Sequence, residues 1–495
     1  MPAAAAAPAA APAALPFRSA LDLAAALRAR EVGCRELLDL YLARVERLDP
    51  RVNAVVVRDF DRARARAGAA DAALARGEVW GPLHGLPMTV KESFDLADLS
   101  TTWGRPELAD HRAGADALAV ERLKAAGAVV FGKTNVPLML ADWQSHNAIH
   151  GTTNNPWDAT RSPGGSSGGA AAALAAGLTG LELGSDIGAS IRNPAHYCGV
   201  YGHKPTWGIC PSRGHALDGN LTETDIAVIG PLARGAADLA TALEAIAGPD
   251  GIEAGAWRLA LPPPRRARLP DWRVAVLLDD RNAEVDRAVG DAIRRLADFL
   301  AAQGAAVSDT ARPAVDTDAA AADYIRLLRA ATSGGIAPEA FAEWQALARE
   351  LPPEDESYRA RMARANTMTH RDWLAANERR HRLRRAWAAF FRDWDLLLCP
   401  AAASAAVPHD LAGERWQRTI AVNGRAVPTT DQLFWAGFSG MALLPSTVAP
   451  AGESPEGLPI GVQIVGPHGG DLSCIEFARQ LEGAWRGFVA PPGFE

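Results

Sequence analysis

Two short turns rich in glycine and serine carry the hydroxyl groups that are best placed for chemistry. The first, residues 164–169, reads GGSSGG, and the second, residues 186–190, reads DIGAS. Ser166 and Ser190 stand 24 positions apart, separated by an alanine-rich stretch predicted to be helical and by a strand predicted at 181–184. A helix and a strand can bring two such turns together, so the pattern favours a catalytic centre over a linker.

A lysine at the end of the strand predicted at 88–90 could supply the base that a serine nucleophile needs. A serine hydroxyl is a weak nucleophile until a neighbouring base takes its proton. Lys91 can be that base if burial lowers the pKa of its amine, and the hydroxyl of a second serine can relay the proton. Taken alone, however, Lys91 is more simply interpreted as a surface lysine whose stem lies on apolar surface.

The first turn fits three other motifs less well. It lacks the Gly-Lys-Ser/Thr ending of a phosphate-binding loop. It is too short for a flexible linker and lies between structured segments. Residues 164–168 match the G-x-S-x-G nucleophile elbow, but the polar, proline-containing residues before them do not form the strand that such an elbow follows.

The second turn can present backbone N–H groups to a developing oxyanion. These groups belong to Ile187, Gly188, Ala189 and Ser190. Small residues in such a turn let the backbone approach a substrate closely. Each donor of this kind typically lowers the barrier by about 3–4 kcal/mol, so the turn is a candidate oxyanion hole.

A series of motifs, spanning nearly the whole chain from about residue 18, resembles the amidase signature family of serine hydrolases. They are the strand ending in Lys91, GKTN at 132–135, NNPW at 154–157, PGGSSGG at 163–169, GSDIGASIRNP at 184–194, GHKPTWG at 202–208, GPLARGAADLA at 230–240 and GLPIGVQIVGP at 457–467. The region 260–430 matches least. So many motifs in one order argue against a chance match.

The resemblance implies a role for each matching residue. The family's nucleophile falls on Ser190, its bridging serine, which follows a cis peptide bond, on Ser166, and its base on Lys91. The amides of residues 187–190 would form the oxyanion hole. Three further residues would hold the turns: Ser167, Asp186 and Arg192. The resemblance implies neither a cofactor nor a metal.

The chain departs from the family pattern at two positions. Ala189 replaces a glycine beside the nucleophile, and His203 replaces an apolar residue before Lys204. We expect the methyl group of Ala189 to fit if φ there is negative, and to crowd the acyl side of the pocket. Neither change removes a catalytic group.

The composition limits the class of protein. The 495 residues are 48% hydrophobic and 22% charged, as in an ordinary globular protein, and the net charge of −7 argues against a nucleic-acid surface. Five scattered cysteines without a C-x-x-C pair indicate reduced thiols and a cytoplasmic location. No run approaches the roughly 20 apolar residues of a membrane-spanning helix, so we expect no membrane association.

Two charged or metal-binding patterns have plainer interpretations. His146 and His150, four residues apart, could bind a metal from a helix, but no third ligand has a suitable spacing, so we expect ordinary hydrogen-bonding histidines. The run RRHRLRR at 379–385 is expected to be a solvated helix face with acidic partners.

Alternating strand and helix signals predict an α/β sheet with helices packed on its faces. Together with the resemblance, these signals lead us to expect an α/β fold with a large central mixed β-sheet flanked by helices on both faces. We expect a disordered Ala/Pro tail at 1–17 and a single domain at 18–495, with a signature core at about 80–250. A helical insert at about 310–395 would form part of the substrate pocket. Later strands are predicted at 273–278, 396–398, 441–444 and 459–465, and a surface crossing at 250–270.

Together these features predict a hydrolase that acts without a cofactor, as a monomer or homodimer. Ser190 would attack the carbonyl of a small amide, ester or carbamate, and water would then free the acyl-enzyme. The chain is similar to the branch that cleaves aryl amides and urethanes, so an apolar or aryl substrate is expected, near Leu140, Trp143 and Trp207. The alternatives are an amidotransferase subunit that acts only with tRNA-loading partners, and a silent binding protein on the same scaffold.

Overall fold

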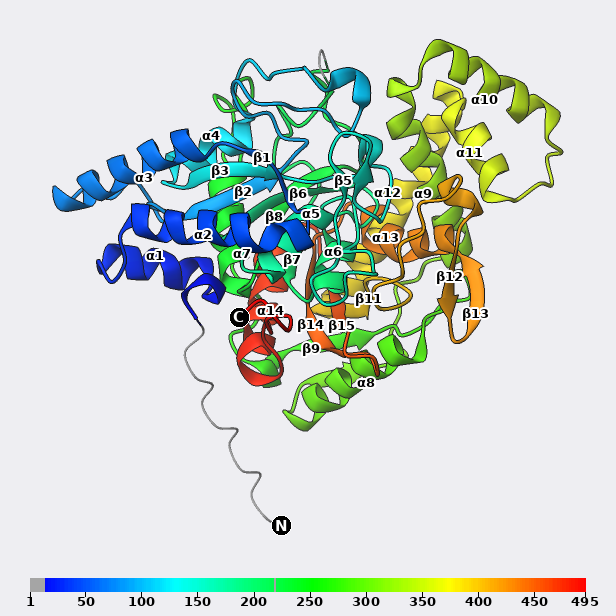
Figure 1. Ribbon diagram of the computed structural model, residues 1–495. Coiled ribbons are helices and arrows are strands. Elements are labelled where there is room, and N and C mark those ends of the chain that lie inside the picture. Colours follow the sequence, from blue (N-terminus) through cyan, green and yellow to red (C-terminus); the bar gives the residue numbers. More distant parts are fainter. Residues whose placement is uncertain (1–13, 218–219) are drawn as a thin grey trace.

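A long β-sheet runs through the middle of the molecule (Figure 1). The computed structural model describes residues 14–217 and 220–495. Within them the sheet strands are β1 (Val55–Arg58), β2 (Pro87–Lys91), β3 (Val129–Thr134), β6 (Glu182–Asp186), β7 (Tyr201–Lys204), β8 (Val228–Ala233), β9 (Arg273–Val276), β10 (Ala306–Ser308), β11 (Leu396–Pro400), β14 (Ser446–Glu453) and β15 (Pro459–Val465). Two separate pairs are β4 (His146–Asn147) with β5 (Gly151–Thr152), and β12 (Thr419–Val422) with β13 (Arg425–Pro428).

The strand order is β1-β3-β2-β6-β8-β7-β14-β15-β11-β9-β10. Strands β3, β2 and β6 run parallel to one another, as do β11, β9 and β10, whereas the strands between these two groups pair antiparallel. The predicted mixed sheet is therefore confirmed. Strand β2, which carries Lys91 at its end, lies between β3 and β6, so both of its edges are covered.

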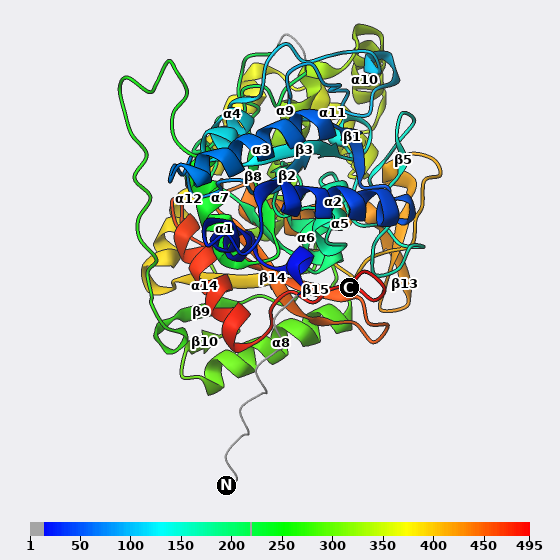
Figure 2. The same ribbon diagram turned by 60° about the vertical axis from the view of Figure 1, so that its left-hand side comes forward.

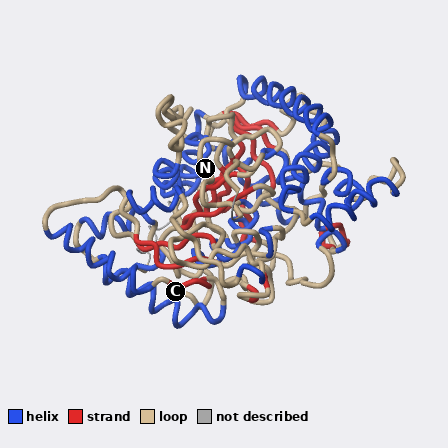
Figure 3. The backbone as a smooth tube through the Cα atoms, turned by 90° about the horizontal axis from the view of Figure 1, so that it is seen from above, coloured by secondary structure: helices blue, strands red, loops and turns tan. Residues whose placement is uncertain are grey.

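Helices flank this sheet on both sides, as predicted and as Figure 3 shows. They are α1 (Ala20–Arg28), α2 (Cys34–Leu48), α3 (Phe60–Ala75), α4 (Leu118–Ala125), α5 (Gly168–Ala175), α6 (Arg192–Cys198), α7 (Ala236–Ile246), α8 (Arg287–Ala302), α9 (Thr317–Thr332), α10 (Pro338–Glu350), α11 (Tyr358–Asn366), α12 (His370–Asp393), α13 (Leu433–Gly440) and α14 (Asp471–Ala484). Helix α8 shows the pattern that places them. Its buried residues Val289, Ile293, Leu296 and Leu300 recur at helical spacing, and its opposite face is charged. None of the described helices is both long and apolar enough to span a membrane.

Helix α5 is buried along its whole length because its residues are small. It contacts the sheet strands β2, β3, β6 and β8 and also helix α6. A Cβ added to Gly169 would lie 2.4 Å from the backbone nitrogen of Asn135, so only glycine allows this approach. The close packing of α5 sets the two serines before it, Ser166 and Ser167, beside β6.

The chain between β10 and β11 is mainly helical, as expected for residues 310–395. Helices α10 and α11 project from the body at the upper right of Figure 1. Helix α9 instead packs against α13 and reaches the interior. The predicted surface crossing is also present: residues 249–268 contain no helix or strand and form the long green loop at the left of Figure 2.

One predicted strand position is wrong. Residues 441–444 form the turn that ends α13, where the amide of Leu444 donates to the carbonyl of Ser439 (3.1 Å), and β14 begins only at Ser446. A short buried apolar run looks the same in a turn and in a strand, so its composition could not separate them. The strand predicted at 181–184 is confirmed with shifted bounds, because β6 runs over Glu182–Asp186.

The predicted tail at 1–17 lies outside the described residues as far as residue 13. Its last part is not a free tail, because Leu15–Phe17 form a 3-10 helix. Phe17 is buried, lies under the guanidinium of Arg44 (5.0 Å to the ring centroid) and stacks on Phe488. The packed chain therefore begins before residue 18.

Candidate active site

Lys91 is fully buried at the end of β2 and points at two serine hydroxyls. Its Nζ donates to Ser166 Oγ (2.6 Å) and to Ser185 Oγ (2.9 Å). Burial lowers the pKa of the amine from 10.5 to about 7, against the opposing effect of the Asp186 and Glu182 carboxyls. The interpretation of Lys91 as a surface lysine is therefore wrong. Sequence reasoning also missed Ser185, whose only signal was its place in the GSDIGAS motif.

The turn that carries Ser166 is held by closely packed backbone. The peptide bond between Gly165 and Ser166 is cis, as the resemblance implied. The carbonyl of Gly164 accepts from Ser145 Oγ (3.1 Å), and the amide of Gly165 donates to Asn193 Oδ1 (3.3 Å). A Cβ added to Gly165 would lie 2.4 Å from a backbone carbonyl oxygen, so this position requires glycine.

Ser167 joins the two serine turns. Its amide donates to the carbonyl of Ser190 (3.0 Å), and its Oγ donates to the carbonyl of Ser185 (3.3 Å). Ser190 is 5% exposed and lines the same cavity as Ser166. The structure thus brings Lys91, Ser166 and Ser190 into one site.

Asp186 and Arg192 form a buried ion pair inside the second turn. The carboxylate accepts from Arg192 Nη2 (2.8 Å) and Nε (3.0 Å), and from the amides of Ala189 and Ile191 (both 3.0 Å). Burial alone would raise the pKa of Asp186, but the guanidinium and the amides outweigh it and lower that pKa to about 2. Arg192 also donates to Gln463 Oε1 (2.6 Å) and so ties the turn to β15.

Two expectations for this turn are corrected. Ala189 has φ of +69°, not a negative value, so its methyl group is held in the left-handed region that favours glycine. Its amide also points inward to Asp186 and is not free to meet an oxyanion. Among the described residues, the amides of Ile187, Gly188 and Ser190 make no hydrogen bond with the protein, and all three residues line the cavity.

The cavity has a volume of about 450 Å³ and is walled by segments far apart in the chain. Tyr324 Oη of α9 donates to the carbonyl of Ile187 (2.9 Å), and Trp143 Nε1 donates to the carbonyl of Gly188 (2.8 Å). These two hydrogen bonds fix the orientation of two successive peptide groups in the turn. Leu140 and Trp143 line the cavity, as expected. Trp207 does not: its indole donates to the carbonyl of Thr224 (3.4 Å), and its ring packs against an apolar cluster that includes Trp143 and Tyr324. Sequence reasoning missed Tyr324, which stands in the region that resembles the family least.

The two histidines do not form a metal site. His146 lies in β4, not in a helix, and its Nδ1 hydrogen-bonds Thr152 Oγ1 (2.8 Å). The described residues contain no group of three His, Cys, Asp or Glu side chains that could hold a metal ion. His203, which stands where the family has an apolar residue, is also structural. It is buried and hydrogen-bonds Thr447 Oγ1 (2.9 Å) and Asp471 Oδ1 (3.1 Å).

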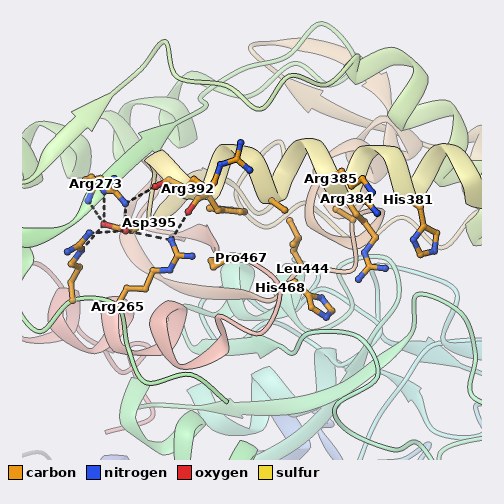
Figure 4. Close-up of a pocket in the computed structure, with 14 residues that line it drawn as sticks. Arg265, Arg273, His381, Arg384, Arg385, Arg392, Asp395, Leu444, Pro467 and His468 are labelled. Carbon is orange, nitrogen blue, oxygen red and sulfur yellow. Dashed lines mark hydrogen bonds and ion pairs between the residues drawn. The ribbon is translucent and has the colours of Figure 1, made fainter. Parts of the chain in front are cut away.

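A larger hollow of about 820 Å³ is strongly basic and holds none of these groups (Figure 4). Three of its arginines surround the single carboxylate of Asp395. The run at 379–385 contributes to it: Arg379 and Arg380 have the expected acidic partners, whereas Arg384 and Arg385 face the hollow. Because Lys91 and the serines lie elsewhere, the smaller cavity is the candidate active site.

Comparisons with known proteins agree with this arrangement. The family model described as Amidase matches residues 36–475. The chain is 34% identical over 481 residues to indoleacetamide hydrolase of Bradyrhizobium diazoefficiens. This alignment covers 94% of this chain and 86% of the relative. It is 32% identical to a glutamyl-tRNA(Gln) amidotransferase subunit from Anaeromyxobacter sp., covering 95% and 97%. A solved, inhibitor-bound complex described as revealing the origins of an s-triazine catabolic enzyme has a TM-score of 0.80 and 30% identity, covering 95% of this chain and 100% of that chain.

Proposed function

The chain belongs to the amidase family and is a hydrolase of amide C–N bonds, and from that premise we propose that it acts through an acyl-enzyme on Ser190. The observation that carries the proposal is the buried contact of Lys91 Nζ with Ser166 Oγ at 2.6 Å. An amine whose pKa is about 7 is largely neutral just above that pH and can then accept a proton.

The first half of the reaction forms the acyl-enzyme. Neutral Lys91 takes the proton of Ser166, Ser166 takes that of Ser190, and Ser190 Oγ attacks the substrate carbonyl. The free amides of Ile187, Gly188 and Ser190 stabilise the oxyanion of the tetrahedral intermediate. The proton then returns through Ser166 to the leaving nitrogen, the C–N bond breaks and the amine departs.

The second half uses water in place of Ser190. Lys91, again through Ser166, removes a proton from water, which attacks the acyl carbonyl. The C–O bond to Ser190 breaks, Ser190 regains its proton, and a carboxylic acid leaves. No step calls for a cofactor, and the same sequence applies to esters and carbamates, which we propose as further substrates.

The test combines two variants with chemical labelling. Ser190→Ala and Lys91→Ala are each expected to abolish measurable hydrolysis of a p-nitroanilide and of an ester. A fluorophosphonate is expected to label the wild-type chain at Ser190, located by mass spectrometry of peptides. Hydrolysis that survives either substitution would refute the mechanism, and a chain that takes up no label and cleaves nothing would be a silent binding protein.

The cavity supports a small apolar or aryl substrate. Leu140, Trp143 and Leu328 present apolar surface to it, and a relative carries indoleacetamide in its name. A panel of aryl amides, aliphatic amides, urethanes and esters, with identification of the products, tests this choice. Equal rates across the panel would count against it.

A second function is that of an amidotransferase component that works only in a complex. It is favoured by the 32% identity to a glutamyl-tRNA(Gln) amidotransferase subunit. We place it second and propose a monomer or homodimer that acts alone on small molecules, without nucleic acid. We also keep the cytoplasmic location as a proposal, supported by five cysteines that are all free and buried.

A further inference from the structure

Two arginine side chains in the active-site cavity have no acidic partner within ion-pair distance among the described residues. Arg329 comes from α9, and Arg415 begins the 3-10 helix Arg415–Gln417. Both line the cavity that contains Ser166 and Ser190. Neither arginine belongs to a motif that resembles the family.

The contacts of these two arginines are with neutral groups. The guanidinium of Arg329 lies over the ring of Tyr358 (5.4 Å to the centroid) and donates to its hydroxyl (2.9 Å from Nε). Arg415 Nη1 donates to the carbonyl of Ala141, while its Nε is buried and has no hydrogen-bond partner in this part of the structure. A buried donor without an acceptor is costly, so an acceptor atom from a ligand would stabilise this arginine.

The charges around the cavity leave these two cations unbalanced. Asp186 is paired with Arg192 (2.8 Å), and Asp142 is paired with Arg418 (2.6 Å). After burial, the largest influence that lowers the pKa of Arg415 is the charge of Arg329, so the two guanidiniums are close enough to repel. The Asp142 carboxylate raises that pKa, but its ion pair is with Arg418. An anion between or beside them would remove that repulsion.

We propose that Arg329 and Arg415 form an anion-binding subsite, and that the preferred substrate is an amide with an apolar body and a carboxylate away from the scissile bond. This inference rests on the proposed function. Guanidinium groups bind carboxylates through charge-assisted hydrogen bonds, often in pairs. Met139, Leu217 and Ile336, which line the same cavity, suit the apolar body.

The test compares amides that differ by one charge. Mono-p-nitroanilides of succinic, glutaric and adipic acid carry a carboxylate on the acyl side, and each has a methyl ketone counterpart of similar shape. 4-Acetamidobenzoate and 4-acetamidoacetophenone make the same comparison on the amine side. For at least one pair, we expect kcat/KM of the full chain to be about tenfold or more higher for the charged member, mainly through KM.

Substitutions then assign the preference to the two arginines. Arg329→Met and Arg415→Met are each expected to bring the ratio within that pair close to one, and Arg415→Lys to keep part of it. The matched control is Arg326→Met, because Arg326 lies on the same helix, is 51% exposed and pairs with Asp323 outside the cavity. This variant should keep the full ratio.

Equal kcat/KM within every pair for the wild-type chain would overturn the inference, and so would a ratio that both methionine variants retain. The wild-type comparison decides even if a variant melts early in a thermal unfolding scan. Failure of the proposed function looks different, because then neither member of any pair is cleaved.

Discussion

At the scale of single residues, burial alone does not distinguish the proposed base. Lys91, Lys133 and Lys204 are all buried, and burial lowers their pKa values to about 7, 8 and 7. Lys204 donates to the carbonyls of Pro205 and Leu444, and Lys133 to a carbonyl and a threonine. Of the three, Lys91 is the one whose partners are serine hydroxyls that line the cavity. The proposal of Lys91 as the base therefore rests on its partners and not on its pKa.

The pKa of Lys91 leads to a pH prediction. The folded pKa lies below the ordinary value of 10.5, so the amine is neutral above about pH 7 and protonated below it. For an uncharged p-nitroanilide, kcat/KM should therefore rise with pH along an acid limb centred near 7. Lys91→Arg stays protonated, and should lose about 10²- to 10⁴-fold of kcat/KM together with the limb.

The control for this profile is Lys124→Arg, because Lys124 lies on α4 and pairs with Asp116 (2.6 Å) away from the cavity. That variant should keep both the rate and the limb. A limb near pH 7 that persists in Lys91→Arg would show that another group titrates.

Ala189 supports a stability prediction. Its φ of +69° costs a residue with a side chain about 1–2 kcal/mol, whereas the extra freedom of glycine in the unfolded chain costs about 0.5–1 kcal/mol. Ala189→Gly should thus raise the free energy of unfolding by about 0.5–1 kcal/mol, measured by urea denaturation. Ala72→Gly, at an exposed position inside α3, should lower it by about 1 kcal/mol. A less stable Ala189→Gly variant would contradict this account.

At the scale of elements, the connection from β6 to α6 is organised by the Asp186 carboxylate. It binds two amides of the turn and the side chain of Arg192, the first residue of α6. Strand, turn and helix are thereby held as one unit that positions Ser190. The turn is also held from outside by Tyr324 of α9, so the region least like the family contacts the turn that carries Ser190 directly.

Removing the charge of Asp186 should show how far the turn depends on this carboxylate. Asp186→Asn leaves Arg192 as a buried, uncompensated cation, and breaking such a pair costs about 3–5 kcal/mol. We expect a loss of that size in urea denaturation and a loss of activity. Glu476→Gln, which breaks a pair with the half-exposed Arg479 on α14, should cost about 1 kcal/mol or less. Similar losses in the two variants would show that Asp186 does not organise the turn.

At the scale of the whole molecule, the cavity draws its walls from Trp103 to Leu433, including α9 and the turns before and after α5. The two serines, Lys91 and the wall that would face a substrate are all supplied by one chain. The proposed mechanism therefore uses no residue from a second protein.

We therefore expect the purified chain to hydrolyse a p-nitroanilide without ATP, an ammonia donor or a second protein. Its specific activity should not change over a hundredfold range of protein concentration, whether it sediments as a monomer or a dimer. The control is Ser190→Ala at the same concentrations. Turnover that appears only after addition of a second protein would favour the amidotransferase role instead.

Much of the site could be predicted from local sequence because its parts are short motifs at the ends of buried strands. The strand before Lys91, the two serine turns and the helix between them were all predictable from residue type and spacing. So was the helix-flanked sheet, because strand and helix signals follow hydrophobic periodicity. These features depend on neighbours in the chain, and the sequence determined them by itself.

Only the tertiary structure decided what lies beyond those neighbours. The positive φ of Ala189, the inward amide of that residue and the hydrogen bond from Tyr324 depend on groups that meet in space, as does the exclusion of Trp207 from the cavity. Arg329 and Arg415, which have no acidic partner among the described residues, belong to the same class. Packing of distant segments sets these contacts, and no spacing within one segment encodes which of them forms.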